Sequence, residues 1–184
     1  MNVTVILADG CEEVEALTII DVLRRAQVNV KGVSVSNSLT VKGSHGIDFN
    51  ADAFFDENEQ CDMIVLPGGM GGRNNILASV PVLDKCKKMA DEDKYVCAIC
   101  AAPTILGRLG ILNGKKATCY PGLENELNGA VIQEGDVVVD GKIITSKGPA
   151  TAMKFAVELV RAIKGDDVAN SVASGLLLRE PLIN

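Results

Sequence analysis

The sequence predicts an α/β protein with a flavodoxin-like, doubly wound architecture, in which helices cover both faces of a mostly parallel sheet. Short runs that are apolar throughout alternate with helices that carry one apolar stripe. Strands that are buried on both faces have this pattern, because helices cover a parallel sheet on either side. The chain has 184 residues and contains no internal repeat or Pro/Ser-rich linker, so we expect a single domain over 1–184.

In the first half of the chain, apolar periodicity predicts the elements. An acidic segment followed by apolar residues at i, i+4 and i+7 is typical of a helix that faces the core. A polar stretch around Gly43-Ser44-His45-Gly46 indicates a hairpin. In order, we expect a strand at 3–7, a helix from 12 to about 26, a strand at 30–36, a hairpin at 39–54, a strand at 63–66 and a glycine-rich turn at 67–72.

The second half has the same alternation with one hairpin inserted. The Asp140-Gly141 pair between two apolar runs predicts a type I′ turn. The most amphipathic helix of the chain should stop at Gly165, because glycine readily ends a helix. In order, we expect a helix at 81–91, a strand at 95–99, a helix at 101–109, a hairpin at 136–145, a helix from 149 to 165 and a helix at 167–178.

The charge balance argues against two classes of partner. The chain has 18 Lys+Arg against 24 Asp+Glu, a net charge of −6, and its basic residues form no stripe. Nucleic acids and anionic membranes attract basic surfaces, so neither is expected as a partner. The chain starts with an apolar strand instead of a basic leader, and no apolar run approaches the roughly 20 residues that span a bilayer. We therefore expect a cytoplasmic protein.

Six cysteines and a single histidine, His45, restrict the chemistry further. Cytoplasmic thiols are normally kept reduced, so all six cysteines are expected to be free. Cys97 and Cys100 have CxxC spacing, but a structural zinc site needs a second pair of ligands at similar spacing, and the sequence offers none. Cys97 falls inside a predicted strand, so we expect it to be a buried core residue. We expect neither a metal nor a cofactor.

The most informative segment is the strand-to-helix junction around Cys100. In open α/β sheets ligands bind beyond the carboxyl ends of the strands, where the junctions 9–15, 67–72 and 99–103 should all open on one edge. Small residues flank Cys100 as an A-x-C-x-A elbow, the pattern that a nucleophile on a tight turn needs. A helix N-terminus there would favour the thiolate. The same loose pattern also fits an inert core cysteine.

The other two junctions have a functional and a purely structural interpretation. Glycines at 67–72 would let the backbone approach a reacting atom and donate N–H groups to an oxyanion, or would simply form a flexible turn. They do not match a phosphate-binding motif. Glu12, Glu13 and Glu15 open a helix, and two of the three are expected only to complement its dipole.

Four segments of the chain form a characteristic set. They are Asp9-Gly10-Cys11-Glu12-Glu13-Val14-Glu15, Leu66-Pro67-Gly68-Gly69, Ala98-Ile99-Cys100-Ala101-Ala102-Pro103 and Thr145-Ser146-Lys147-Gly148-Pro149-Ala150-Thr151. Together they resemble the ThiJ/PfpI superfamily, and most closely its DJ-one branch, that of the Parkinsonism-associated deglycase. The resemblance covers essentially the whole chain, with the motifs in the right order on the right junctions.

This resemblance implies a flavodoxin-like fold, a homodimer and a set of site residues. It implies an oxidisable cysteine of low pKa at Cys100 and a protonated glutamate at Glu15 that hydrogen-bonds the sulfur or its sulfinate. It also implies that Gly69 and Ala101 supply backbone N–H groups. A carboxyl beside a thiolate should have a raised pKa because of the like charge, and would then be neutral and able to donate.

The chain lacks a histidine that many members of the family have near the nucleophile. Many members have one near the nucleophile where this chain has Tyr120, and other branches have one directly after the nucleophile where this chain has Ala101. A Cys-His dyad therefore cannot form unless His45 reaches the site from its hairpin, which we do not expect. This disfavours peptidase and amidotransferase activity and leaves Tyr120 as an accessory polar neighbour.

The chemistry that remains needs only a thiolate and a carboxylic acid. The resemblance implies a cofactor-independent glyoxalase or deglycase that acts on small aldehydes such as methylglyoxal or on glycated substrates, as a defence against carbonyl and oxidative stress. The alternative is a non-catalytic redox sensor or redox-regulated chaperone that acts through oxidation of Cys100. Cys11 lies at the first junction and is either an accessory resolving thiol or a plain loop residue.

Overall fold

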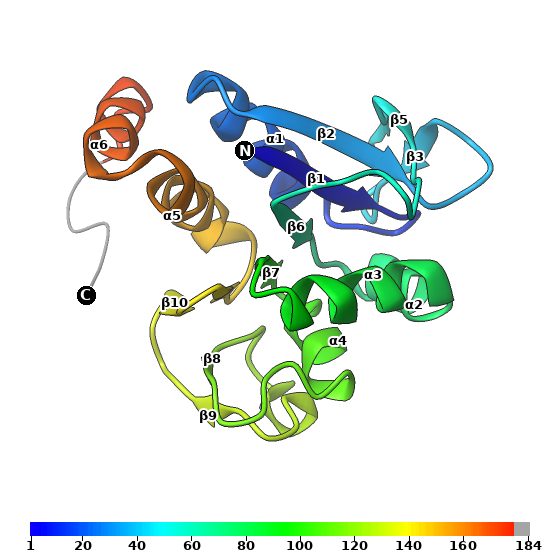
Figure 1. Ribbon diagram of the computed structural model, residues 1–184. Coiled ribbons are helices and arrows are strands. Elements are labelled where there is room, and N and C mark those ends of the chain that lie inside the picture. Colours follow the sequence, from blue (N-terminus) through cyan, green and yellow to red (C-terminus); the bar gives the residue numbers. More distant parts are fainter. Residues whose placement is uncertain (179–184) are drawn as a thin grey trace.

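A seven-stranded, mostly parallel sheet forms the centre of the computed structural model, which describes residues 1–178 (Figure 1). The strand order is β10-β11-β7-β6-β1-β2-β5, and every neighbouring pair is parallel except β10 with β11. This confirms the predicted fold class. The strands of this sheet are β1 (Asn2–Leu7), β2 (Asn29–Ser34), β5 (Ala53–Phe54), β6 (Met63–Leu66), β7 (Tyr95–Ile99), β10 (Val137–Asp140) and β11 (Ile143–Ser146).

Helices cover both faces of the sheet, because successive side chains of each strand point to opposite sides. In β1, Val5 and Leu7 pack into the cluster that includes α1, α5 and α6, whereas Ile6 packs into the cluster with α2, α3 and α4. Figure 1 shows α5 and α6 on one side and α2, α3 and α4 on the other. The helices are α1 (Glu13–Arg25), α2 (Met70–Leu77), α3 (Val80–Asp91), α4 (Pro103–Arg108), α5 (Ala152–Lys164) and α6 (Asp166–Gly175).

Helix α2 begins at Met70 and so replaces the second half of the glycine-rich turn expected at 67–72. Its Met-Gly-Gly opening has low helix propensity, which is why the sequence pattern missed it. The glycines are needed because the helix packs directly on the first junction: a Cβ on Gly72 would lie 2.7 Å from Cys11 Cα, and one on Gly71 would lie 3.0 Å from Gly10 Cα. Close backbone packing here outweighs propensity.

The two hairpins are present, with corrections. β3 (Thr40–Lys42) and β4 (Asp48–Asn50) pair antiparallel as predicted, but residues 53–54 leave the hairpin and extend the main sheet beside β2. The β10–β11 turn has Gly141 and Lys142 at its centre. Gly141 has a φ of +61° and Lys142 is not in the left-handed region. The predicted type I′ turn is therefore wrong, since that turn needs a positive φ at both central residues.

A small two-stranded sheet and two short 3-10 helices, η1 and η2, were not expected from the sequence. The new elements are β8 (Lys116–Ala117), β9 (Val131–Ile132), η1 (Glu124–Glu126) and η2 (Pro149–Thr151).

Within residues 1–178, no helix is both long enough and apolar enough to cross a bilayer.

Candidate active site

The three strand-to-helix junctions meet at one edge of the sheet, as predicted. The Glu12 backbone N–H donates to the Gly68 carbonyl at 3.0 Å, which joins the first junction to the second. A Cβ on Gly68 would lie 2.5 Å from Cys100 Cβ, so the second junction touches the third. Side chains from α1 and from the elbow after β7 are thus brought together around one glycine.

Cys100 occupies a strained elbow directly after β7. Its φ is +64°, a left-handed conformation that non-glycine residues rarely adopt and that occurs preferentially at functional sites. Two backbone hydrogen bonds hold it: Cys100 N–H donates to the Ser146 carbonyl at 2.9 Å, and Tyr120 N–H donates to the Cys100 carbonyl at 2.8 Å. The residue is 7% exposed. The helix behind it, α4, begins only at Pro103 and has six residues, shorter than expected.

Glu15 approaches the same point from the first turn of α1. It is fully buried, and its Oε2 accepts a hydrogen bond from the Gly68 N–H at 2.8 Å. Its second oxygen, Oε1, is buried without a hydrogen-bond partner among residues 1–178. A buried carboxyl oxygen with no partner is costly. This atom is therefore the natural place for a proton or for a bond to a bound molecule.

Burial raises the pKa of Glu15 to about 7, while the hydrogen bonds from Gly68 and Cys100 lower it. The predicted direction is confirmed, but the main cause is burial and not the like charge that the sequence argument assumed. The pKa of Cys100 is raised to about 12, by burial and then by the charge of Glu15. The expected low-pKa thiol is therefore wrong for this state: the short α4 helix cannot offset burial beside a carboxylate.

Glu15 and Cys100 therefore act as one titrating pair. Each group opposes ionisation of the other, so above about pH 7 the pair carries one negative charge and keeps one proton, whereas at lower pH both groups are protonated. The backbone N–H groups of Gly69 and Ala101 both lower the pKa of Cys100, which means that they favour charge on the sulfur. Chemically, this arrangement can move a proton between sulfur and carboxylate while two fixed N–H groups stabilise the sulfur.

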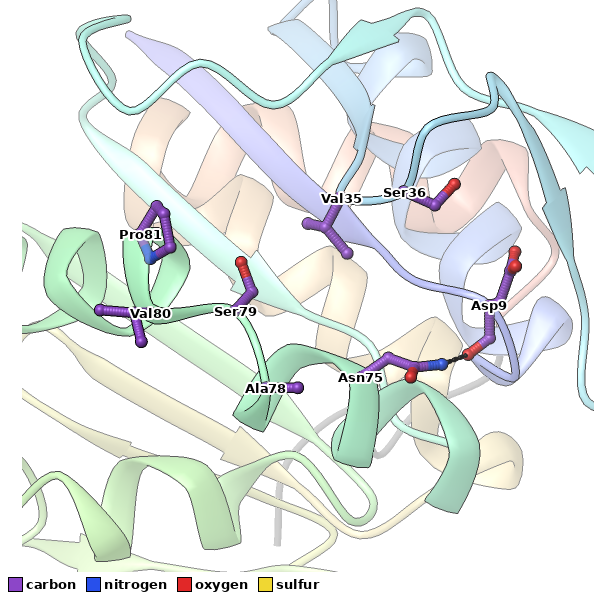
Figure 2. Close-up of a pocket in the computed structure, with 8 residues that line it drawn as sticks. All are labelled: Asp9, Val35, Ser36, Asn75, Ala78, Ser79, Val80 and Pro81. Atoms are coloured by element: carbon purple, nitrogen blue, oxygen red, sulfur yellow. Dashed lines mark hydrogen bonds between the residues drawn. The ribbon is translucent and has the colours of Figure 1, made fainter.

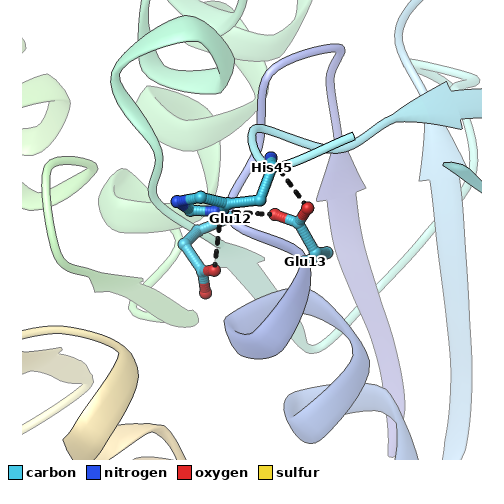
Figure 3. Close-up of side chains that lie close together, drawn as sticks. All are labelled: Glu12, Glu13 and His45. Carbon is cyan, nitrogen blue, oxygen red and sulfur yellow. Dashed lines mark hydrogen bonds and ion pairs between the residues drawn. The ribbon is translucent and has the colours of Figure 1, made fainter. Parts of the chain in front are cut away.

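Glu12 and Glu13 do more than complement the helix dipole. Glu12 caps α1, with Oε2 accepting from the Glu15 N–H at 2.9 Å. Glu13 accepts bonds from the His45 N–H at 2.8 Å and from Ser44 Oγ at 3.0 Å, and thereby fastens the β3–β4 hairpin to α1 (Figure 3). Burial alone would raise the pKa of Glu13. Hydrogen bonds from its own backbone, His45 and Ser44 outweigh burial and lower this pKa to about 2.

His45 lies at this hairpin, 3.1 Å from Glu13 Oε2 and 3.6 Å from Glu12 Oε1 through its Nδ1 (Figure 3). The ligand atoms of Glu12, Glu13 and His45 all lie within 4.8 Å of one another, a spacing that a metal ion could use. Both oxygens of Glu13 already accept hydrogen bonds, however. Glu12, Glu13 and His45 therefore lie close together because they hold the β3–β4 hairpin against α1, a contact that we call the clamp. Within residues 1–178, no hydrogen bond joins His45 to Cys100.

Two expected accessory residues lie at the margin of the pair. Tyr120 contacts the elbow through its backbone, while its half-exposed ring lies over Gly148, where a Cβ would come within 3.3 Å of the ring. Cys11 is fully buried, and burial raises the pKa of its thiol to about 12, which makes it a poor resolving nucleophile. All six cysteines are unpaired and buried, and Cys97 is the core residue that was predicted.

A separate cavity of about 590 Å³ opens on the far side of Asp9, between the end of β2 and the α2–α3 junction (Figure 2). The Asn75 amide donates to the Asp9 carbonyl at 2.8 Å across its floor. Neither Cys100 nor Glu15 lines it. The cavity is therefore not the candidate active site.

Sequence reasoning did not place Gly68 among the site residues, although it separates the two reacting groups. A Cβ there would also come within 2.8 Å of Glu15 Oε2. The signal was present in the Pro67-Gly68-Gly69 run directly after a buried strand. Only the contact between three junctions shows which of these glycines lies between the cysteine and the glutamate.

Fold and site define a flavodoxin-like α/β protein with a cysteine on a strand-to-helix elbow beside a buried glutamate. A model of the DJ-1/PfpI family matches residues 1–162, and the chain belongs to this family. Proteins of this family are generally homodimeric, and the family includes enzymes of the glyoxalase and deglycase type. Membership supports a DJ-1-like function in the oxidative stress response.

Individual relatives agree with this placement. Protein DJ-1 homolog B of Arabidopsis thaliana is 40% identical over 180 residues, which cover 96% of this chain but only 41% of that protein. Protein dj-1beta of Drosophila melanogaster is 37% identical over 178 residues, 95% of each chain. The solved structure of oxidized Toxoplasma gondii DJ-1 has a TM-score of 0.94 at 36% identity, over 97% of this chain and 99% of that one.

Proposed function

We propose that this protein is a cofactor-independent glyoxalase or protein deglycase that acts on small reactive aldehydes such as methylglyoxal. Cys100 is the nucleophile, Glu15 carries the proton, and Gly69 and Ala101 stabilise charge through their backbone N–H groups. The observation that supports this best is the burial of Glu15 and Cys100 on either side of Gly68, a Cβ of which would touch both. With a pKa of about 7, Glu15 is suited to both giving and taking a proton near neutral pH.

In the first step Cys100 adds to the aldehyde carbon of methylglyoxal. The S–H bond breaks as the S–C bond forms, and the thiol proton passes through Glu15 to the former carbonyl oxygen. The product is a hemithioacetal. Because Glu15 takes the proton as sulfur attacks, the reaction does not need a preformed thiolate, and the raised pKa of Cys100 is compatible with it.

In the second step Glu15 moves a proton between adjacent carbons. The carboxylate removes the hydrogen from the carbon that carries sulfur, and the same proton returns to the neighbouring carbon. The proton of the hemithioacetal hydroxyl passes to the former ketone oxygen. The former ketone becomes an alcohol and the hemithioacetal becomes a thioester. Water then hydrolyses the thioester to release lactate and regenerate the Cys100 thiol. One methylglyoxal and one water give one lactic acid, so no external oxidant or reductant is required.

The test is lactate formation from methylglyoxal by the wild-type protein and by Cys100→Ser. The matched control is Cys97→Ser, which removes a buried thiol three positions away that lies in the strand and not on the elbow. We expect turnover in the wild type and in Cys97→Ser and its loss in Cys100→Ser. Wild-type lactate formation no faster than that of Cys100→Ser would refute the proposal.

A redox-sensing or redox-regulated chaperone role is the second candidate, and one observation favours it. Glu15 Oε1 is buried without a partner among residues 1–178, and the Glu15 carboxyl lies next to Gly68, which Cys100 also contacts. A protonated Glu15 could therefore donate to an oxygen of a Cys100 sulfinate. Intact mass after limiting peroxide tests this. A gain of two oxygens in the wild type, absent in Cys100→Ser, supports the role, whereas a loss of two hydrogens indicates a Cys11–Cys100 disulfide instead.

We further propose that the chain forms a homodimer in the cytoplasm. Val14 and Leu17 on α1 and Ile47 on the hairpin that Glu13 fastens to it are 52%, 43% and 57% exposed, and a second copy of the chain could bury these apolar side chains. Six free thiols suit a reducing compartment. Light scattering should give twice the chain mass for the wild type and the single mass for Leu17→Glu. A monomeric wild type would contradict the homodimer.

A further inference from the structure

Gly69 and Ala101, the two backbone donors, belong to different segments, and one buried side chain connects these segments. Gly69 precedes α2, and Ala101 precedes α4. Arg73 in α2 lies four positions after Gly69, and its N–H donates to the Gly69 carbonyl at 2.9 Å. Its side chain is only 6% exposed and points away from solvent towards α4.

Arg73 reaches the Cys100 elbow through Thr104. Arg73 Nε donates to Thr104 Oγ1 at 2.7 Å, and Thr104 Oγ1 donates to the Ala101 carbonyl at 2.7 Å. Thr104 is fully buried. A hydroxyl has one proton to give, so the direction of both bonds is fixed: the guanidinium donates to the hydroxyl, and the hydroxyl donates to the carbonyl.

The other end of the guanidinium is anchored by a carboxylate. Arg73 Nη2 pairs with Glu126 in η1, which also accepts from Arg108 Nη2 at 2.8 Å. The hydrogen bond from Arg108, with the charges of both arginines, lowers the pKa of Glu126, so the carboxylate stays charged. The planar fork of an arginine holds both directions at once, which a lysine cannot do. Arg73 is thereby fixed in one geometry.

We infer that Arg73 is a positioning residue that sets the spacing between the Gly69 and Ala101 N–H groups around the Cys100 sulfur. This inference rests on the proposed function. Hydrogen bonds run from the Gly69 carbonyl through Arg73 and Thr104 to the Ala101 carbonyl. The backbone N–H groups of the two end residues, Gly69 and Ala101, both lower the pKa of Cys100. Donors that stabilise developing charge must be held in place before the reaction, since displacements of about 1 Å can cost about 100-fold in rate.

Thr104→Val tests this positioning, because valine keeps the shape of threonine and removes the hydroxyl that links Arg73 to Ala101. Thr104→Ser restores the hydroxyl. Arg73→Met removes the guanidinium but keeps a long unbranched side chain. Arg108→Met is the matched control, because Arg108 also pairs with Glu126 but makes no bond to Thr104 or Ala101. A circular dichroism melt of each variant checks that the fold is retained.

Two readouts separate positioning from general stability. With methylglyoxal we expect kcat to fall about tenfold in Thr104→Val and Arg73→Met, with KM changed by less than about twofold. Deleting a donor of this kind lowers kcat about 100-fold, and a donor that is only displaced should cost less. The pH profile of Cys100 labelling by iodoacetamide should shift to higher pH in the same two variants. Thr104→Ser and Arg108→Met should behave like the wild type in both measurements.

Three results would overturn the inference. Wild-type labelling profiles in Thr104→Val and Arg73→Met would show that the link does not reach the sulfur. An equal effect of Arg108→Met would show a merely structural network. An effect of Arg73→Met without one of Thr104→Val would show that the charge of Arg73 acts and not its position. The labelling profile does not depend on turnover, so absence of lactate formation in the wild type would refute the proposed function and leave this test intact.

Discussion

Glu15 and Gly68, 53 positions apart in the chain, are joined by a 2.8 Å hydrogen bond from the Gly68 N–H to the buried Glu15 carboxylate. Gly68 also contacts the Cys100 elbow, where a Cβ on the glycine would lie 2.5 Å from Cys100 Cβ. One glycine thus fixes how close the glutamate and the cysteine come. The proposed reaction requires the two groups to stay at this separation.

Glu15→Gln should separate the two effects of Glu15 on Cys100. Glutamine accepts the Gly68 hydrogen bond but carries no charge and cannot take the thiol proton. Loss of the charge lowers the pKa of Cys100, so we expect iodoacetamide labelling of Cys100 at pH 8 to speed up by about tenfold, the equivalent of about one pKa unit. Lactate formation should slow by at least about 100-fold, because glutamine cannot carry the proton. The wild-type profile should bend near pH 7, where Glu15 titrates, and the variant profile should not. Identical profiles from pH 5 to 8 would argue against the pair.

The pH dependence of stability should report the same carboxyl. The pKa of Glu15 is raised from 4.5 to about 7 on folding, so its protonated form favours the folded state. Its contribution is fully present below pH 4.5 and is lost as pH rises through about 7. Glutamine does not titrate, so Glu15→Gln removes this pH dependence. The free energy of unfolding of the variant minus that of the wild type should therefore increase by up to about 3 kcal/mol between pH 4.5 and pH 8. Urea titrations measure this difference, and a pH-independent difference would contradict it.

Gly68→Ala should damage the site more than the fold elsewhere. The added Cβ would meet Cys100 Cβ at 2.5 Å, the Glu15 carboxylate at 2.8 Å and the Ile99 carbonyl at 2.9 Å. We expect a loss of about 1–3 kcal/mol in stability from overpacking and at least about 100-fold slower lactate formation, because the reacting groups are pushed apart.

Gly175→Ala is the control for Gly68→Ala. It lies at the end of α6, and among residues 1–178 no atom lies within 4 Å of its Cβ position. Alanine there should leave lactate formation unchanged and raise stability by up to about 1 kcal/mol. Wild-type turnover in Gly68→Ala would show that the separation of Glu15 and Cys100 is not critical.

Glu13→Ala should release the β3–β4 hairpin from α1. The carboxylate accepts bonds from the His45 N–H and from Ser44 Oγ, and its loss leaves both donors without their partner. Hydrogen exchange of the amides from Gly43 to Ile47 should speed up by about tenfold, the equivalent of about 1.4 kcal/mol for two lost hydrogen bonds. Asp48→Asn changes a charge on the same hairpin without touching the clamp and should leave the exchange unchanged. Equal effects of both variants would contradict the clamp.

The clamp should also depend on pH in the opposite sense to Glu15. The pKa of Glu13 is lowered from 4.5 to about 2, mainly by hydrogen bonds from its own backbone, His45 and Ser44 that overcome the effect of burial. Its contribution is therefore present above pH 4.5 and is lost as pH falls towards 2. Exchange at the hairpin amides should accelerate over this acid range in the wild type and stay flat in Glu13→Ala, after correction for intrinsic exchange rates.

Local sequence patterns were enough to predict the helix–sheet–helix layers, the order of most helices and strands, and the tight turn at Cys100. Apolar strands alternating with amphipathic helices can be buried only in a covered parallel sheet, and this local pattern does not depend on distant contacts. For the same reason the small residues around Cys100 marked a turn after a strand. The pattern missed α2, because glycines that disfavour a helix are kept there for close packing on Cys11.

The protonation of the site residues and the contacts that position them depend on the tertiary structure. Whether Glu12, Glu13 or Glu15 is buried beside the cysteine depends on contacts with segments 30 to 50 positions away, which leave no mark in the local pattern. The raised pKa values of Glu15 and Cys100 come mainly from burial, a property of the packed molecule and not of the residues. The link from Arg73 through Thr104 to Ala101 likewise exists only once the fold brings these two side chains from α2 and α4 within hydrogen-bonding distance.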